Sequence, residues 1–319
     1  MNDSQLFGFW LAVAASVPFA AYILPRKLSR LPVLEYQCWL GLAVAPIMII
    51  ATIIAHEGMF VSVPAVLLAV SCGPLWAFGS IFYAQAVDHI GVARSTPIKN
   101  LAPMWASIYG ILLFREYTMA EPTPLIAAIG GTIMMILAAQ LLGKAGAPST
   151  ERAFAYDINR SATERKNAYR KGWLYSFFTA AFYGAYSVPL KMSLKGGMGA
   201  IAACAWLGIG VLITSTFAYQ IVSKSLWPKR PENRELKLAL GAGAIWTTAQ
   251  VLGTIAMLHV AMSVSWPISN LSTLIAIGWG VWVFKEVRLA DHKREVWTSL
   301  IVYSIGLGLL ALAAREGHV

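Results

Sequence analysis

Long apolar segments alternate with short polar connections along almost the whole chain. A transmembrane helix needs about 20 consecutive, mostly apolar residues. Ten segments come close to this length, and they are Phe7–Leu24, Tyr36–Ala55, Val63–Val87, Ser95–Phe114, Pro124–Leu142, Trp173–Leu190, Gly199–Val222, Leu236–His259, Val264–Phe284 and Trp297–Ala314. The pattern therefore predicts an all-α membrane protein with ten transmembrane helices.

The low content of charge separates this chain from soluble proteins. Of its 319 residues, 58% are hydrophobic and 13% are charged, whereas soluble domains carry about 25% charged residues. The net charge of +10 would suggest a nucleic-acid partner in a soluble protein, but basic cytoplasmic loops produce the same excess in a membrane protein. We therefore expect a lipid bilayer, and no nucleic acid, as the chain's surroundings.

No motif in the sequence indicates a cofactor, a metal or an enzyme. Cys38, Cys72 and Cys204 lie far apart in apolar segments, without metal-site spacing. The chain has no His-Glu-x-x-His motif, no Gly-x-Ser-x-Gly motif and no glycine-rich phosphate loop with a lysine. An intramembrane enzyme is therefore disfavoured, and any transport would draw on an ion gradient or on the substrate gradient itself.

Basic residues gather in alternate connections between the apolar segments. One set comprises Arg26, Lys27, Arg30, Arg94 and the basic residues within 144–171, 224–237 and 285–294, whereas the opposite set has only Arg115, Lys191, Lys195 and Arg315. Cytoplasmic loops are enriched in Lys and Arg. The first set is therefore predicted inside the cell, and both termini are predicted outside the cytoplasm.

One stretch of the sequence occurs twice. Shifted by 170 residues, Gly73–Thr118 matches Gly243–Arg288 without a gap. The residues shared in one register include rarer types, in the pairs Trp76/Trp246, His89/His259, Pro97/Pro267, Asn100/Asn270 and Glu116/Glu286. Chance matches between apolar stretches would share mainly Leu, Ala and Val, so the chain contains an internal duplication.

The duplication extends to the earlier segments. The pattern Tyr-x-x-Pro-x-Lys occurs at Tyr22–Lys27 and at Tyr186–Lys191, and Trp-Leu-Gly occurs at residues 39–41 and 206–208. The predicted organisation is a first five-helix repeat (1–143), a polar linker (144–171) and a second five-helix repeat (172–319). Because five is odd, the second repeat must insert upside down, and inverted repeats of this kind build many secondary transporters with a site at the repeat interface.

These repeats and their ends resemble the drug/metabolite transporter superfamily, which has ten spans in two repeats and a short apolar-Glu signature closing the fourth and ninth spans. Here that signature is Phe114-Arg-Glu116 and Phe284-Lys-Glu286. Within the superfamily, residues 83–98 (YAQAVDHIGVARSTPI) are similar to the bacterial glucose/ribose-uptake and rhamnose-transport branch. The resemblance implies a sugar substrate, coupling to protons or sodium, and a bacterial inner membrane.

Two matched Pro-x-x-Asn sequences are candidates for the substrate site. Pro97 and Pro267 each remove a backbone donor and kink a helix, which a membrane tolerates only against protein or a water-filled cavity. Asn100 and Asn270 follow three residues later, so they would face each other across a cavity and bind substrate. The alternative is that these residues only fix helix geometry.

Three ionisable residues lie near membrane depth. Lys99 could hold a substrate carboxylate, exchange a proton, or pair with Glu35 or Asp88, because an intramembrane charge is costly and usually faces a cavity or a partner. Its long stem could instead reach the interface. Glu35 and Asp88 are candidates for ion coupling, because a carboxylate in an apolar site can carry protons near neutral pH, although both could also be solvated at segment ends.

Aromatic and amide side chains inside the segments complete the predicted site. A sugar has apolar C–H faces and a polar rim, so we expect stacking on aromatic rings and hydrogen bonds to amides. The candidates are Trp76, Trp246, Tyr186, Trp266, Gln85 and Gln250. Some of these aromatic residues could instead belong to interfacial belts. Glu116 and Glu286 are expected to bond to helix-end groups rather than to substrate.

Taken with what the superfamily resemblance implies, the preferred interpretation is a secondary active transporter that imports a neutral monosaccharide, with protons as the coupling ion, by alternating access at the repeat interface. A single chain holds both repeats, so a monomer suffices for the pathway. The rival interpretation is an exporter of amphipathic or charged metabolites on the same fold, which Lys99 and the aromatic residues would also suit.

Overall fold

The computed structural model describes residues 2–90, 95, 98–117, 122–155, 162–269, 271–272, 274–275, 279 and 293–316. In these ranges the chain forms helices without any strand. The helices are α1 (Asp3–Ala21), α2 (Ile23–Leu28), α3 (Val33–Ile54), α4 (Val63–Ile90), α6 (Ala102–Phe114), α7 (Pro122–Ala155), α8 (Ala162–Ala185), α9 (Ser187–Lys195), α10 (Ala200–Ser223), α11 (Asn233–His259), α12 (Met262–Ser269) and α14 (Lys293–Glu316). The all-helical prediction is confirmed for this part of the chain.

Six helical stretches in the described ranges are long and apolar enough to cross a membrane. They are Asp3–Leu28, Val33–Ile54, Val63–Ile90, Ala200–Ser223, Asn233–His259 and Lys293–Ala314. Two shorter apolar helices, Ala102–Phe114 and Pro122–Ala138, overlap other predicted segments. The chain is therefore a multi-pass membrane protein. Part of the predicted linker is helical, because α7 continues to Ala155 and α8 begins at Ala162.

Two helix breaks follow from proline. Pro25 lacks the N–H group that would bond to the carbonyl of Ala21, and α1 ends at Ala21. Pro189 stands in the same relation to Ala185, where α8 ends. Since a proline inside a helix removes one hydrogen bond and clashes with the preceding turn, the repeated Tyr-x-x-Pro-x-Lys sequence produces the same break twice, at Tyr22 and at Tyr186.

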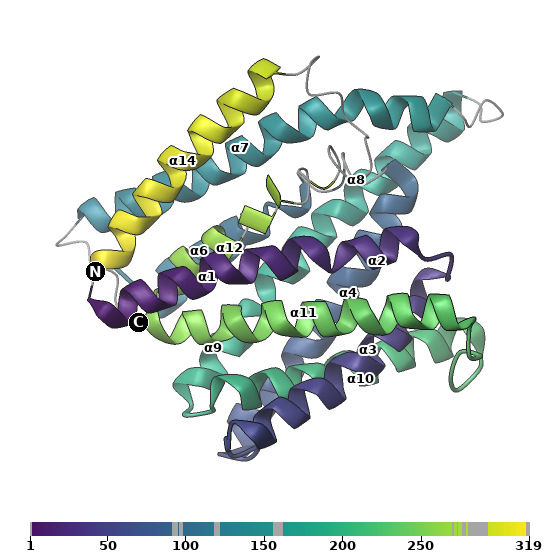
Figure 1. Cartoon of the computed structure of the whole chain (residues 1–319), viewed down its shortest axis with the longest axis horizontal. Coiled ribbons are helices and arrows are strands. Elements are labelled where there is room, and N and C mark those ends of the chain that lie inside the picture. Colours follow the sequence, from purple (N-terminus) through teal and green to yellow (C-terminus); the bar gives the residue numbers. More distant parts are fainter. Residues whose placement is uncertain are drawn as a thin grey trace.

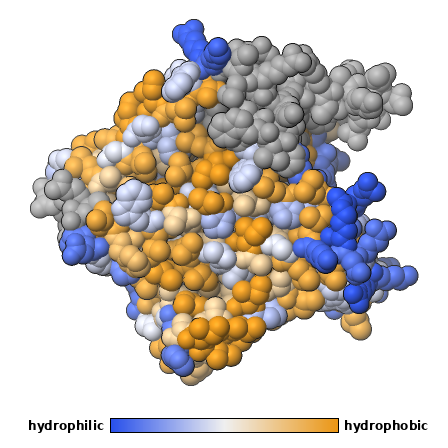
Figure 2. All heavy atoms as spheres, viewed as in Figure 1, coloured by the Kyte–Doolittle hydropathy of each residue, from blue (hydrophilic) through white to orange (hydrophobic). Residues whose placement is uncertain are grey.

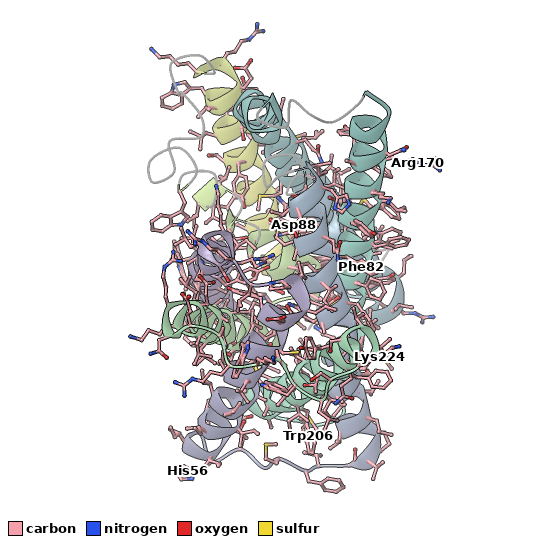
Figure 3. All side chains as sticks on the ribbon, turned by 90° about the vertical axis from the view of Figure 1, so that its right-hand side faces the viewer. His56, Phe82, Asp88, Arg170, Trp206 and Lys224 are labelled. Atoms are coloured by element: carbon pink, nitrogen blue, oxygen red, sulfur yellow. The ribbon has the colours of Figure 1, made fainter. Side chains whose placement is uncertain are left out.

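The helices pack as pairs that join the two halves of the chain. The most extensive contacts join α1 with α11, α3 with α10, α4 with α8, and α7 with α14, and α6 packs on α12. Figure 1 shows α14 alongside α7, with the start of α1 and the end of α14 on the same side of the molecule. Phe82 of α4 points toward α8 (Figure 3), where its ring meets those of Tyr175, Phe178 and Phe182. The two halves are thus interleaved and share one helix bundle.

Small residues allow these helices to approach closely. A Cβ atom on Gly73 of α4 would overlap the backbone of Gly210 on α10. On α11, a Cβ on Gly243 would lie 2.6 Å from the carbonyl oxygen of Leu40 and 2.8 Å from Cβ of Ala43. Membrane helices have little hydrophobic force between them and rely on such close packing.

The surface of the bundle matches a membrane environment. Hydrophobic residues cover most of the face seen in Figure 2, and hydrophilic residues gather at its right-hand edge, where the α2–α3 and α10–α11 connections lie in Figure 1. Exposed apolar side chains include Ile54, Leu67, Phe217 and Val222. Their exposure is expected where lipid replaces water as the solvent.

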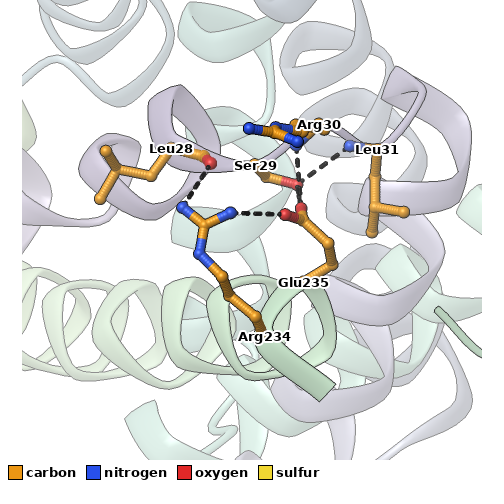
Figure 4. Close-up of polar contacts among 6 residues, drawn as sticks. All are labelled: Leu28, Ser29, Arg30, Leu31, Arg234 and Glu235. Atoms are coloured by element: carbon orange, nitrogen blue, oxygen red, sulfur yellow. Dashed lines mark hydrogen bonds and ion pairs between the residues drawn. The ribbon is translucent and has the colours of Figure 1, made fainter. Parts of the chain in front are cut away.

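At this hydrophilic end, Glu235 joins the first turn of α11 to the turn between α2 and α3 (Figure 4). Its carboxylate accepts hydrogen bonds from the Ser29 hydroxyl (2.6 Å) and the Arg30 N–H (2.9 Å), and Arg234 donates to it at 3.0 Å. Arg234 also donates to the Leu28 carbonyl at 3.4 Å. This cluster fixes where α2 ends against α11.

We predict opposite effects for two alanine substitutions on one helix. Alanine in place of glycine within a helix stabilises by about 0.5–1 kcal/mol, so Gly241→Ala, which meets no atom within 4 Å, is expected to raise the thermal unfolding midpoint in detergent slightly. Gly243→Ala is expected to lower it, because forced overpacking costs about 1–3 kcal/mol. Equal midpoints for the two variants would show that α11 and α3 do not pack as described.

Candidate functional site

A cavity of about 500 Å³ lies inside the bundle. It is lined by Phe19, Tyr22, Trp76, Lys99, Ala102, Pro103, Tyr183, Tyr186, Trp246, Trp266, Ser269 and Ser272. These residues come from both halves of the chain. Five of the nine predicted substrate-binding residues line it, namely Lys99, Trp76, Trp246, Tyr186 and Trp266.

Aromatic rings form most of the cavity wall. Trp76 of α4 and Trp246 of α11 are repeat-equivalent residues, and their ring centroids lie 4.0 Å apart at an interplanar angle of 37°. Tyr183 stacks on Trp76 with centroids 6.2 Å apart, and Trp266 meets Tyr186 edge to face at 5.2 Å. The rings hold one another in place, so they offer preformed flat faces to a ligand.

Lys99 brings a formal positive charge into this aromatic setting. Its ammonium group lies 5.1 Å from the centre of the Tyr83 ring, a distance typical of a cation–π interaction. Among the described residues no carboxylate lies within ion-pair distance of Lys99, which leaves its predicted pairing with Glu35 or Asp88 unformed. An ammonium group has three donors and no acceptor, so Lys99 can donate to ligand oxygen atoms.

A smaller cavity of about 230 Å³ adjoins the first and shares Phe19, Trp266 and Ser269 with it. Gln250 lines this smaller cavity. The Gln250 amide is engaged on both sides, because its oxygen accepts from the Tyr186 hydroxyl at 3.0 Å and its nitrogen donates to Thr254 at 3.1 Å. Gln250 therefore orients a residue of the main cavity wall.

Other predicted site residues lie elsewhere. Asn100 is 2% exposed and does not line either cavity, and Asn270 lies outside the described residues, as does Pro97. Gln85 is half-buried on α4, and neither cavity includes it. A direct role of Gln85, Asn100 and Asn270 in substrate binding therefore stays a prediction.

The two predicted coupling acids are also away from the cavity. Glu35 is half-buried in the first turn of α3. Asp88 lies near the end of α4 (Figure 3), where its side chain is 54% exposed and 3.8 Å from Arg26. Neither acid lines the main cavity.

The internal repeat would have identified two of the lining residues that were not predicted from the sequence. Ten of the lining residues form repeat-equivalent pairs, which are Phe19/Tyr183, Tyr22/Tyr186, Trp76/Trp246, Lys99/Ser269 and Ala102/Ser272. The equivalents of the other two, Pro103 and Trp266, are Thr273 and Thr96, which lie outside the described residues. Extending each predicted residue to its repeat partner would have added Tyr22 and Ser269.

Comparison with known proteins identifies a family and a fold. The family model described as "Sugar transport protein" matches residues 35–313. A protein of Priestia megaterium named "Probable glucose uptake protein GlcU" is 23% identical over 250 residues, covering 77% of this chain and 79% of that protein. A Streptococcus pyogenes serotype M1 protein named as a sugar uptake protein is 19% identical over 243 residues, covering 75% of this chain and 76% of its own length. A solved crystal structure that is 14% identical covers 99% of both chains with a TM-score of 0.69, so the two share a fold.

We predict that the hydrogen bond between Tyr186 and Gln250 contributes to stability. Tyr186→Phe leaves the buried Gln250 oxygen without this donor and is expected to lower the unfolding midpoint by the equivalent of about 1 kcal/mol. Tyr303→Phe is the matched control, because the Tyr303 hydroxyl is buried without a hydrogen-bond partner among the described residues. A loss in Tyr303→Phe as large as that in Tyr186→Phe would contradict the assignment.

Proposed function

The chain belongs to the sugar transport protein family, and from this premise we propose that it is a secondary active transporter that imports a neutral monosaccharide together with protons. In this proposal it lies in the inner membrane of a bacterium with both termini outside the cytoplasm. A monomer is sufficient because one chain contributes both walls of the cavity.

The observation that carries the proposal is the composition of the main cavity. Its wall is built from repeat-equivalent residues of the two halves, such as Trp76 with Trp246 and Tyr22 with Tyr186. A site at the interface of two repeats can be opened from either side when one half moves against the other. This composition supports alternating access around the cavity.

Helix packing supports the same relation between the halves. Cβ atoms on Gly41 and on Gly208, which are equivalent in the repeat, would each lie 3.2 Å from a Cα atom of the other half, those of Leu212 and Ala45 respectively. Leu212 and Ala45 are themselves equivalent in the repeat. In the same way, the contact of Gly73 with Gly210 is equivalent to the contact of Gly243 with Ala43. The contacts are therefore preserved when the halves are exchanged, as expected for two repeats related by a two-fold axis. Ten spans in two inverted five-helix repeats remain part of this proposal.

The chemistry of the cavity supports a sugar as the substrate. Tryptophan and tyrosine faces can cover the apolar C–H faces of a pyranose. Lys99, Ser269, Ser272 and the tyrosine hydroxyl groups offer hydrogen bonds to its hydroxyl groups. Neutral sugars are the class of substrate in the name of the glucose uptake relative. No formal negative charge is needed on such a substrate, because a lysine donates hydrogen bonds to neutral oxygen atoms.

Lys99 also favours a second candidate function. A positive charge inside an aromatic cavity would suit a charged amphipathic metabolite, which the protein would export on the same fold. Loss of such an exporter would sensitise cells to a compound without affecting growth on any sugar. The family relationship makes sugar import the preferred proposal.

Uptake into proteoliposomes tests the proposal. We expect labelled glucose, or another neutral monosaccharide of a panel, to accumulate when an inward proton gradient is imposed. Lys99→Gln is expected to raise the half-saturation concentration about tenfold, the effect of losing about 1.4 kcal/mol of binding free energy. Lys229→Gln is the matched control, because Lys229 is exposed and lies outside the cavity.

The coupling ion is tested in the same vesicles. Proton-driven accumulation is expected to fall in Glu35→Gln or Asp88→Asn, while exchange of labelled for unlabelled sugar continues. If sugar uptake responds to a sodium gradient and not to a proton gradient, the coupling ion is sodium and the proposal of proton coupling fails. If no sugar of the panel moves, the import proposal fails and the exporter of charged metabolites becomes the account to test.

A further inference from the structure

A buried carboxylate joins three helices beside the main cavity. Glu116 follows the end of α6 and is 1% exposed. Its two oxygen atoms accept the N–H groups of Met262 (2.7 Å) and Ser263 (3.0 Å), at the N-terminus of α12. From α9, the Lys191 ammonium, also in a buried side chain, lies 3.5 Å from the same carboxylate. The sequence-based expectation that Glu116 bonds to helix-end groups is confirmed. The ion pair of Glu116 with Lys191 was not predicted from the sequence.

The local backbone is shaped to bring Glu116 to this place. Arg115 ends α6 in the left-handed conformation, with φ 52°, and turns the chain back toward the helix. Gly110, one and a half turns earlier, leaves the space that the carboxylate occupies, because a Cβ atom there would overlap the Glu116 carboxylate oxygen. A residue larger than glycine at position 110 would displace the carboxylate from α12.

Of the two helices that Glu116 fastens, α12 carries cavity residues and α9 directly follows one. Tyr186 stands directly before the first residue of α9, and Trp266 lies on α12. Their rings contact each other edge to face at 5.2 Å, and both line the main cavity. In the proposed topology Arg115, Lys191 and the start of α12 lie toward the outer side of the membrane. The Glu116 junction therefore lies between the Tyr186–Trp266 contact and that side.

We propose that the Glu116–Lys191 ion pair is the outer gate of the transporter, which closes the cavity when it fastens α9 and α12 to α6. The proposal rests on the proposed function, because a gate requires alternating access. Opening toward the outside separates α6 from α9 and α12 and admits water to both charges.

The energetics of a buried ion pair suit such a gate. The attraction between buried charges is largely offset by the loss of their hydration, so a buried pair adds little net stability compared with an apolar contact. The hydration is regained when the pair opens. An apolar seal of similar size would favour the closed state strongly, whereas an ion pair keeps the two states close in free energy, as a transport cycle requires.

Other charged groups near the junction do not provide an equivalent contact. Lys195, one turn further along α9, lies 5.5 Å from the centre of the Phe114 ring and repels Lys191. Glu57 provides a matched comparison, because it accepts the N–H groups of Ile201 and Ala202 near the N-terminus of α10, both at 2.9 Å. Among the residues that the structure describes, no lysine lies within ion-pair distance of Glu57, and Glu57 does not line the main cavity.

Thiol labelling from the outside of sealed cells tests the gate. The reporter is Ser269→Cys, which lines the cavity and is 7% exposed, in a chain whose three native cysteines are replaced by alanine. The labelling rate with a membrane-impermeant maleimide is compared in the parent, in Glu116→Gln with Lys191→Met, and in Glu57→Gln. The double substitution is neutral and keeps the approximate volume of both side chains, so no unpaired charge is buried.

We expect the double variant to label about tenfold faster than the parent, within the range typical of coupling between sites, and Glu57→Gln to label at the parent rate. A parental rate in a double variant that elutes as a folded monodisperse protein would overturn the proposal. An equal rise in Glu57→Gln would also overturn it, because helix capping alone would then explain the effect. Faster labelling of the double variant by a protein that takes up no sugar would support the gate and reject the sugar substrate. Normal sugar uptake with labelling of the double variant at the parent rate would support the substrate and reject the gate.

Discussion

The missing hydrogen-bond donor of two prolines shapes the site more than any other single feature. In a bilayer every backbone polar group needs a partner within the protein, and a helix break is tolerated only beside protein or a hydrated cavity. Pro25 and Pro189 end α1 and α8, and the residues at the two breaks, Tyr22 and Tyr186, both line the main cavity. The cavity thus lies where the helical backbone has been interrupted.

Close helix packing determines how much of that cavity remains open. Glycines at positions 41, 73, 208 and 243 bring α3, α4, α10 and α11 together with almost no space for a side chain. The same helices hold Trp76 and Trp246 in contact. Small residues thus bring these backbones close together, while the large rings of Trp76 and Trp246 contribute to the cavity wall.

Much of this arrangement could be predicted from the sequence, and the reasons differ between residues. Rare residue types repeated in register identified Trp76 and Trp246, and the cost of an intramembrane charge identified Lys99. Helix pairing could not be predicted, because the pattern of apolar residues in a lipid-exposed helix does not specify its neighbours. The contact of Glu116 with Lys191 depends on that pairing, and so does the engagement of Gln250 by Tyr186 rather than by a ligand. The exposure of the Asp88 side chain agrees with the solvated alternative that its place at the end of an apolar segment had suggested.

The central claim is that the cavity shared by the two halves binds a neutral monosaccharide. Equilibrium binding of labelled glucose and other sugars to the purified protein, compared with Trp246→Ala, tests it most directly. Losing about 1.4 kcal/mol of contact with the indole ring corresponds to a tenfold weaker affinity, so we expect saturable binding of at least one sugar to weaken about tenfold or more in the variant. Saturable binding that is unchanged in a folded Trp246→Ala protein would place the sugar elsewhere and contradict the account.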